Sequence, residues 1–161
     1  MRLELEPCVL RNWQDEDAPA LAEGANNRKV WLHLRDIMPH PYSLEDAESY
    51  LRQLSQNPDK LTFCIEIDGR VAGAIGLNLQ SDVHRLTAEL GYWLAEPFWG
   101  RGVMTAAVKA FVAYSFETLP LQRIFASAYA NNPASVRVLE KAGFPIRGPN
   151  AAQCDQGWRN P

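Results

Sequence analysis

The chain has 161 residues and a mass of 18.1 kDa, which is enough for one domain with a sizeable core. Its net charge of −3 and sequence pI of about 5.6 give no overall basic field that would attract nucleic acid. No apolar run approaches the roughly 18 residues of a membrane helix, and acidic residues stand where a signal peptide is apolar. We therefore expect a cytoplasmic protein that binds neither nucleic acid nor membrane.

The first part of the chain predicts a strand and then helices. An apolar run over 8–10 is typical of an opening strand, and Asp15 or Asp17 then caps a short helix that runs toward Asn26. Residues 27–42 mix apolar side chains with prolines, and we expect a short helix and a loop there.

The next helix has clear signals at both ends. Ser43 followed by Asp46 is a capping signal, and apolar residues then recur at helical spacing until Pro58. A strand is predicted over 62–67, and Asp68-Gly69 is a strong signal for a two-residue hairpin turn.

The rest of the chain alternates strands with helices. We expect strands at 70–79, 86–94 and 123–129, a helix of about four turns after Val103, and a helix from Asn132-Pro133 to Gly143. A helical crossover joins the last two strands, so they should be parallel. The sequence therefore predicts an α/β (α+β) fold with a mixed central sheet flanked by helices.

Gly100-Arg101-Gly102 lies where a predicted strand gives way to a helix. Backbone N–H groups at a helix start favour an anion, and glycines let an anion approach the backbone closely. A phosphate cradle and a plain structural turn are both consistent with this stretch. Its spacing is neither G-x-x-x-x-G-K-[ST] nor G-x-G-x-x-G, which argues against a nucleotide-binding enzyme of either type.

Two longer motifs carry a more specific resemblance. The stretch AELGYWLAEPFWGRGVMTAAVKAF, with residues 89–102 at its centre, is followed by NNPASVRVLEKAGF, which includes 132–144. Together they resemble the GCN5-related N-acetyltransferase (GNAT) superfamily. The likeness is closest to the branch that acetylates ribosomal-protein N-termini and spermidine, and it covers roughly residues 2–148.

The resemblance implies acetyl-CoA as the co-substrate and no metal. In the family the pyrophosphate lies on the glycine turn, and the pantetheine arm contacts the backbone of the preceding strand, where it splays from its parallel neighbour. Trp99 stands where the broad superfamily has Gln or Arg, and Met104 stands where it has Gly or Ala. The closer branch tolerates both changes. The implied cofactor-binding residues are Tyr92, Trp93, Leu94, Trp99, Gly100, Arg101, Gly102, Val103, Met104, Thr105 and Asn132.

The transfer of acetyl to an amine needs a neutral nitrogen, so a base must accept a proton. Glu89 matches the acidic residue of the family motif and is the candidate base; a half-exposed strand glutamate, or one that orients the substrate ammonium, is the alternative. Many superfamily members place a Tyr acid where this chain has Leu139. Ser135 matches the serine of the closer branch and is the candidate donor to the leaving thiolate, although a helix-start serine often satisfies local backbone.

Cysteine, histidine and tryptophan give weaker signals. The cysteines are odd in number and lack a C-x-x-C pair, which argues against a disulfide framework and a structural zinc site. The histidines are too dispersed for a metal site or a triad; His40 is read as a surface residue, with the wall of an acceptor pocket as the alternative. Trp31, Trp93 and Trp99 are expected to pack rather than to stack on a ligand. The scattered residues are Cys8, Cys64, Cys154, His33, His40 and His84.

The end of the chain is expected to depart from the family. We predict one GNAT domain over 1–148 and an atypical tail over 149–161, because prolines and little apolar content follow Ile146. Truncated C-terminal strands would leave a sheet edge open, to be covered by a homodimer or by irregular backbone of the same chain.

The leading hypothesis is an N-acetyltransferase that works by direct attack in a ternary complex. The acceptor is a primary amine of a protein N-terminus, a polyamine or a small molecule. A non-catalytic acyl-CoA-binding or regulatory module is the alternative, favoured by Leu139 and by the short C-terminus.

Overall fold

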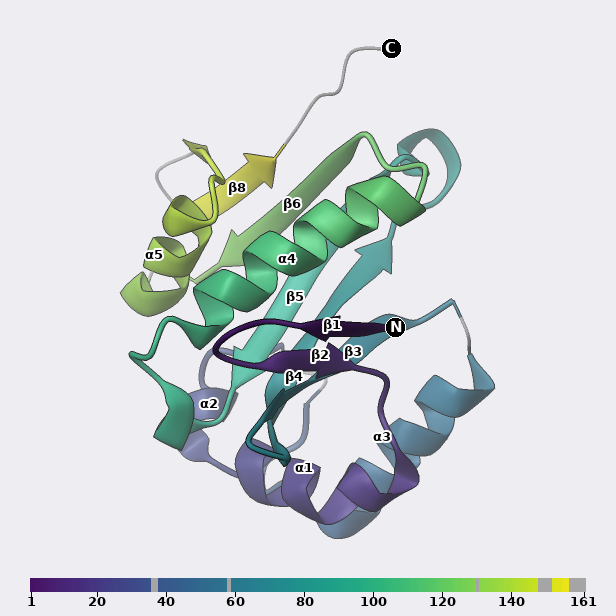
Figure 1. Ribbon diagram of the computed structural model, residues 1–161, viewed down its shortest axis with the longest axis vertical. Coiled ribbons are helices and arrows are strands. Elements are labelled where there is room, and N and C mark those ends of the chain that lie inside the picture. The colour runs from purple at the N-terminus through teal and green to yellow at the C-terminus, as the bar shows by residue number, and fades with distance from the viewer. Residues whose placement is uncertain (36–37, 58, 130, 148–151, 157–161) are drawn as a thin grey trace. The chain divides into compact units, whose positions relative to one another are not determined.

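The computed structural model describes residues 1–35, 38–57, 59–129, 131–147 and 152–156, with Arg147 and the last five described by their backbone alone. The hydrogen-bonded strand order is β1-β2-β3-β4-β5-β6-β8-β7 (Figure 1). Parallel and antiparallel pairs both occur, so the predicted mixed sheet of an α/β fold is confirmed. The chain divides into two compact units: the first unit is 1–76 with 92–103, and the second unit is 77–91 with 104–161.

The strands of the first unit form an antiparallel ladder. Leu10 of β2 pairs with Leu3 of β1 on one side and with Ile65 of β3 on the other. Asp68 and Gly69 have φ angles of 49° and 73°, the positive values that a tight hairpin turn requires. The strands predicted at the start of the chain and before this turn are confirmed, and β1 is an addition. The bounds are β1 Arg2–Glu4, β2 Val9–Arg11, β3 Leu61–Ile67 and β4 Arg70–Leu79.

The helices of the first unit begin where the sequence predicts. The Asp46 backbone N–H donates to Ser43 Oγ at 3.1 Å, and the Asp46 carboxylate accepts from the Ser43 backbone N–H at 2.8 Å. This capping box begins α3, and the hydrogen bonds from Ser43 lower the pKa of Asp46. The bounds are η1 Asp15–Asp17, α1 Ala18–Ala25, α2 Arg28–Trp31 and α3 Leu44–Gln56.

The core of the first unit lies between α1 and α3, which run side by side in Figure 1. Leu21 and Leu51 are almost fully buried there, and Trp13 packs edge-on against Tyr50. Tyr42 joins this cluster, and its burial raises its pKa to about 12. Apolar residues spaced three and four apart thus form the faces that hold the two helices together.

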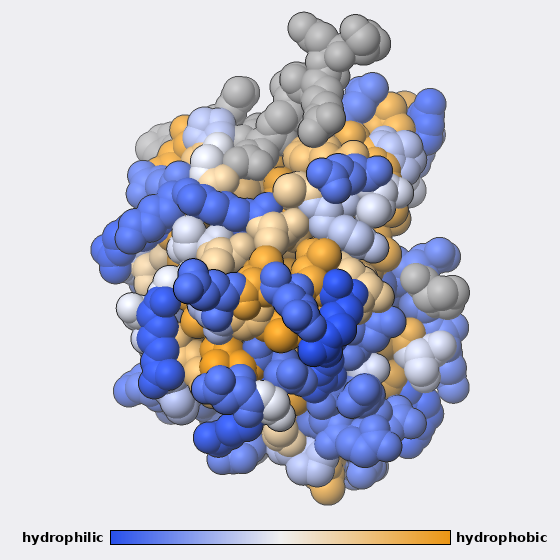
Figure 2. All heavy atoms as spheres, in the orientation of Figure 1, coloured by the Kyte–Doolittle hydropathy of each residue, from blue (hydrophilic) through white to orange (hydrophobic). Residues whose placement is uncertain are grey.

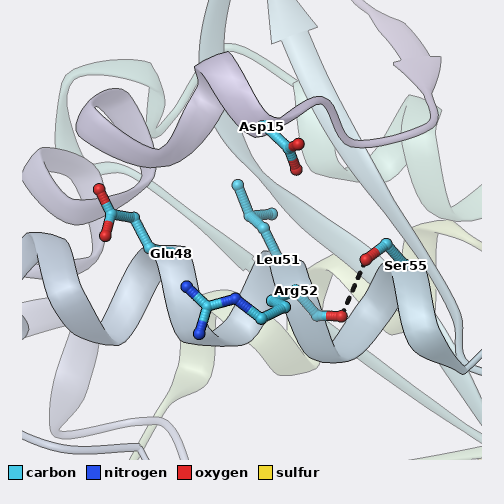
Figure 3. Close-up of a pocket in the computed structure, with 5 residues that line it drawn as sticks. All are labelled: Asp15, Glu48, Leu51, Arg52 and Ser55. Atoms are coloured by element: carbon cyan, nitrogen blue, oxygen red, sulfur yellow. Dashed lines mark hydrogen bonds between the residues drawn. The ribbon is translucent and has the colours of Figure 1, made fainter.

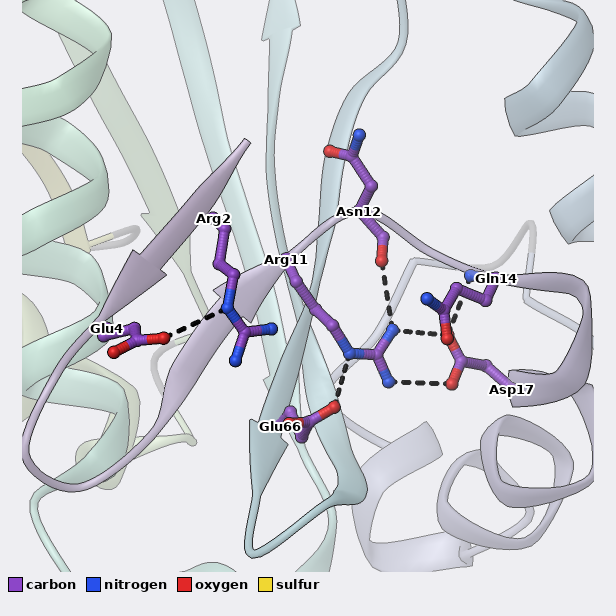
Figure 4. A network of polar contacts seen from close by, with 7 residues as sticks. All are labelled: Arg2, Glu4, Arg11, Asn12, Gln14, Asp17 and Glu66. Atoms are coloured by element: carbon purple, nitrogen blue, oxygen red, sulfur yellow. Dashed lines mark hydrogen bonds and ion pairs between the residues drawn. The ribbon is translucent and has the colours of Figure 1, made fainter.

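A buried ion network ties β2 to the start of α1 (Figure 4). The Arg11 guanidinium donates to both carboxylate oxygens of Asp17, at 2.7 and 2.8 Å, and to Glu66 on β3 at 2.5 Å. Asp17 also accepts from the Gln14 backbone N–H at 2.9 Å. Asp17 therefore fixes the entry to α1 mainly by binding Arg11, a role that sequence reasoning did not foresee.

The second unit is built on a parallel strand pair, as predicted. β5 and β6 pair from Thr87 opposite Arg123 to Leu90 opposite Ala126, and α4 makes the crossover between them. α5 contacts β6 and β8, and Phe111, Ile124 and Leu139 are fully buried. The bounds are η2 Asp82–His84, β5 Thr87–Leu94, α4 Val103–Thr118, β6 Arg123–Ala128 and α5 Pro133–Lys141. The last three residues of β5 and the short helix η3 (Glu96–Phe98) belong to the first unit.

The prediction of truncated C-terminal strands is wrong. Residues Ala152–Gln156 form β8, which pairs antiparallel with β6 along Ile124–Ala128, and β7 (Ile146–Arg147) pairs antiparallel with β8. Backbone hydrogen bonds make this pairing, so it does not need the alternating apolar pattern that the tail lacks. The edge of β6 is covered by the same chain, which removes the basis for expecting a homodimer there and the main reason to doubt catalytic competence. A single domain over 1–148 stays a prediction.

The face drawn in Figure 2 mixes hydrophilic residues with smaller apolar areas. The exposed large apolar side chains come from separate parts of the chain, as is usual for a protein surface. They are Leu32, Leu44, Leu79, Val83, Trp99, Tyr129 and Ile146.

Candidate active site

The glycine turn between η3 and α4 has a conformation that its glycines permit. Gly100 and Gly102 both have a φ of 74°, which side-chain-bearing residues rarely adopt. No heavy atom of the described residues beyond the chain neighbours lies within 4 Å of a Cβ built at either position. The conformation of the turn therefore requires glycine at both positions, and the missing side chains also leave open the space that a phosphate cradle needs.

Aromatic side chains hold this turn against the end of β5. Trp99 Nε1 donates to the Leu94 carbonyl at 2.7 Å, although the Trp99 side chain remains 43% exposed. The exposed Arg101 places its guanidinium carbon 5.7 Å from the centre of the Phe98 ring. The turn thus places the Arg101 cation next to backbone that the Trp99 hydrogen bond ties to β5.

The short helix η3, which leads into the turn, is bound to α2 and its N-cap residue. Glu96 accepts a hydrogen bond from Asn27 Nδ2 at 2.8 Å and an ion-paired one from Lys29 Nζ. These bonds, the one from Lys29 first, lower the pKa of Glu96. Nearly seventy residues of sequence separate the partners, so no local motif could have identified this contact.

The three strand residues predicted to contact pantetheine have different surroundings. A Cβ built at Gly73 would lie 2.2 Å from the Trp93 carbonyl oxygen, so that carbonyl faces β4. Successive residues of a strand direct their backbone groups to opposite edges, which places those of Tyr92 and Leu94 on the other edge. The Trp93 side chain packs against the core of α1 and α3, which confirms that this tryptophan packs.

Trp31 and His40 form a second aromatic contact in the first unit. Their rings stack at a centroid distance of 5.2 Å, and Trp31 Nε1 donates to the Met38 carbonyl at 2.8 Å. His40 is exposed, which agrees with its interpretation as a surface residue.

The second unit contains the two candidate catalytic residues. Glu89 is half-buried on β5, opposite Phe125 of β6, and Ser135 is half-buried in the first turn of α5. Asn132 caps α5, because its Oδ1 accepts from the Ser135 backbone N–H at 3.2 Å. Leu139, which stands where many relatives have a tyrosine acid, is 1% exposed.

The predicted cofactor residues are divided between the units. Trp99 and Leu94 are joined by a hydrogen bond in the first unit, and Asn132 and Ser135 are joined in the second. Met104 is buried, so its side chain serves the core, while Thr105 is half-buried in the first turn of α4. The first unit holds Tyr92, Trp93, Leu94, Trp99, Gly100, Arg101, Gly102 and Val103, and the second holds Glu89, Met104, Thr105, Asn132 and Ser135.

A pocket in the first unit lies away from these residues, between η1 and α3 (Figure 3). Its walls mix acidic and basic side chains, and Ser55 Oγ donates to the Arg52 carbonyl at 2.9 Å. None of its lining residues belongs to the predicted site. They are Asp15, Glu48, Leu51, Arg52 and Ser55.

The described thiols are unsuited to nucleophilic chemistry. Cys8 and Cys64 are free and buried, and burial raises their pKa values to about 11 and about 12. Within the described ranges, no group of three or more His, Cys, Asp or Glu side chains is arranged to hold a metal ion. No helix among the described residues has both the length and the apolar character needed to cross a bilayer.

In a comparison with known protein families, residues 8–145 match the acetyltransferase (GNAT) domain. Ribosomal-protein-serine acetyltransferase of Escherichia coli is 30% identical over 124 residues, which cover 74% of this chain and 69% of that protein. Spermidine N(1)-acetyltransferase of the same species is 27% identical over 141 residues, or 86% and 73% of the two chains. YdaF of Bacillus subtilis is 42% identical over 81 residues, 50% of this chain, and the match spans only 44% of YdaF.

Solved structures share the fold at low sequence identity. A GNAT-family acetyltransferase from Bacillus anthracis superposes with a TM-score of 0.82 at 20% identity, covering 99% of this chain and all of the other. RimL, a ribosomal-protein acetyltransferase solved in complex with coenzyme A, gives a TM-score of 0.77 at 21% identity, covering 96% and 95%.

Proposed function

Because the chain belongs to the GNAT family of acetyltransferases, we propose that it transfers an acetyl group from acetyl-CoA to a primary amine. The observation that carries this proposal is the open glycine turn at the start of α4, with Gly100 and Gly102 at positive φ and Arg101 exposed. Backbone N–H groups at a helix start and an adjacent guanidinium suit a pyrophosphate. Acetyl-CoA supplies the activated thioester.

The chain's own residues supply the remaining functions. The turn from Trp99 to Thr105 binds the pyrophosphate, and the backbone edge of Tyr92 and Leu94 orients the pantetheine arm. Glu89 accepts the proton that the amine must lose, directly or through water. Ser135 donates a hydrogen bond to the sulfur of the thiolate that leaves when the C–S bond breaks.

The acceptor that we propose is a primary amine on a protein N-terminus, a polyamine or a small molecule. Two relatives are named for a ribosomal protein and for spermidine, and these set the first compounds to try. A panel of amines, with release of the CoA thiol as the readout, separates an enzyme from the alternative of a non-catalytic acyl-CoA-binding module. The buried Leu139 is the observation that still favours that alternative.

The cofactor assignment is tested by Gly102→Asp, which adds a negative charge where the phosphates are proposed to bind. Calorimetry with CoA should show at least about a tenfold loss of affinity, the size of one lost charge-assisted contact. Gly69→Asp is the matched control, because Gly69 has nearly the same positive φ, of 73°, and equally open surroundings in the β3–β4 turn. Equal CoA affinity in the two variants would contradict the cradle.

A further inference from the structure

Gly91 is a glycine inside β5 that the packing of the described residues does not require. Its φ is not positive, and no heavy atom of the described residues beyond its chain neighbours lies within 4 Å of a Cβ built there. Gly73 on β4 differs, because a Cβ there would collide with backbone. A glycine weakens a strand, and one without an internal reason marks a place where something else approaches the backbone closely.

The surroundings of Gly91 indicate which group comes close to its backbone. The parallel pairing of β5 with β6 is described up to Leu90 opposite Ala126, and Gly91 is the next residue, exposed, while β6 continues to pair with β8. Side chains two residues apart in a strand point to the same face, so Gly91 shares its face with Glu89. Two strand residues span only about 6.6 Å. A bare patch of backbone therefore lies within side-chain reach of the proposed base.

We propose that Gly91 provides the space for the acyl group of the thioester, and thereby limits the size of acyl group that the chain accepts. This inference rests on the proposed function, because the amine and the thioester carbonyl must meet where Glu89 can take the proton. A methyl group at position 91 would occupy the volume that the acyl carbons need. Free CoA carries no acyl group, so this methyl group should not change its affinity.

The test is Gly91→Ala, with calorimetric affinities for CoA, acetyl-CoA and propionyl-CoA, so that no acceptor is needed. We expect the affinity for CoA to stay within about twofold. The affinity for acetyl-CoA should fall by about tenfold and that for propionyl-CoA by more, as for a methylene that no longer fits. The melting temperature should stay or rise, because alanine at a compatible φ reduces the entropy of the unfolded chain.

Gly24→Ala on α1 is the control for the same change elsewhere. Its Cβ would lie 3.4 Å from Ala95 Cβ, an ordinary contact, and all three affinities should match those of the wild type. The inference is overturned if Gly91→Ala keeps wild-type affinity for both acyl-CoA donors, if it weakens CoA binding equally, or if it fails to fold. No binding of CoA by the wild-type chain would instead contradict the proposed function, and this inference with it.

Discussion

The two units use polar side chains in different ways. In the first unit, Arg11 is 8% exposed and binds the buried Asp17 and the partly buried Glu66. In the second, the proposed catalytic residues Glu89 and Ser135 are half-buried. A buried, paired charge stabilises one conformation, whereas a half-buried group remains within reach of a substrate. We therefore predict that substitutions in the Arg11 network change stability alone, and that substitutions of the proposed catalytic pair change turnover alone.

The largest effect is expected for Glu89→Gln, which removes the proposed base with little change of shape. Turnover with an accepted amine should fall by about 10²–10⁴, the usual contribution of general-base catalysis. The affinity for acetyl-CoA and the melting temperature should barely change. Glu117→Gln, an exposed glutamate on α4, is the control. Wild-type turnover of Glu89→Gln across the pH range would leave Glu89 a structural residue.

Arg11→Leu should produce the converse result, a loss of stability without a loss of site chemistry. It leaves the buried carboxylate of Asp17 and the partly buried one of Glu66 without their partner, which costs about 3–5 kcal/mol in the free energy of unfolding. Urea denaturation measures this loss. Arg2→Leu breaks the exposed pair with Glu4, with side chains 56% and 73% exposed, and should cost less than about 1 kcal/mol. If the two variants lost similar amounts of unfolding free energy, burial would not determine how much an ion pair contributes to stability.

Ser135→Ala tests the role proposed for the second candidate catalytic residue of the second unit. If Ser135 donates to the leaving thiolate, turnover should fall by about tenfold, as for a hydrogen bond to a charged group. The loss should shrink for acyl donors with a more acidic thiol, because such a leaving group needs less stabilisation. A loss of the same size for every donor, accompanied by a lower melting temperature, would assign Ser135 to the packing of α5.

Ser43→Ala is expected to have the smallest effect, about 1 kcal/mol of stability from the lost N-cap of α3. The hydrogen bonds from Ser43 lower the pKa of Asp46, so their contribution is complete above the unfolded pKa of Asp46 and is lost as the pH falls through the folded value. The stability difference between wild type and variant should therefore narrow in acid. A difference that grows below pH 4 would contradict this assignment of the cap.

Local signals in the sequence predicted most of the elements. The capping box at Ser43, the Asp68-Gly69 turn and the parallel pairing of β5 with β6 are confirmed, because each depends on neighbouring residues or on one crossover. Local signals do not predict β8, because this strand forms by backbone pairing with β6, which is distant in sequence. The contacts of Glu96 with Asn27 and Lys29 could not be predicted for a similar reason, because these residues are distant in sequence and meet only in the folded chain. The family motifs predicted the site residues, and their roles stay predictions.

The indole of Trp99 provides an optical probe of the glycine turn. Of the four tryptophans that the structure describes, Trp13, Trp31 and Trp93 are partly buried, and Trp99 alone is exposed. Its ring is anchored through Nε1 to the Leu94 carbonyl, so it stays in place while its face meets solvent. A molecule that covers the turn would move this indole into a less polar environment, and its emission would shift to shorter wavelength. Ligand binding could thus be followed by intrinsic fluorescence, with Trp99→Phe giving the background from the other indoles.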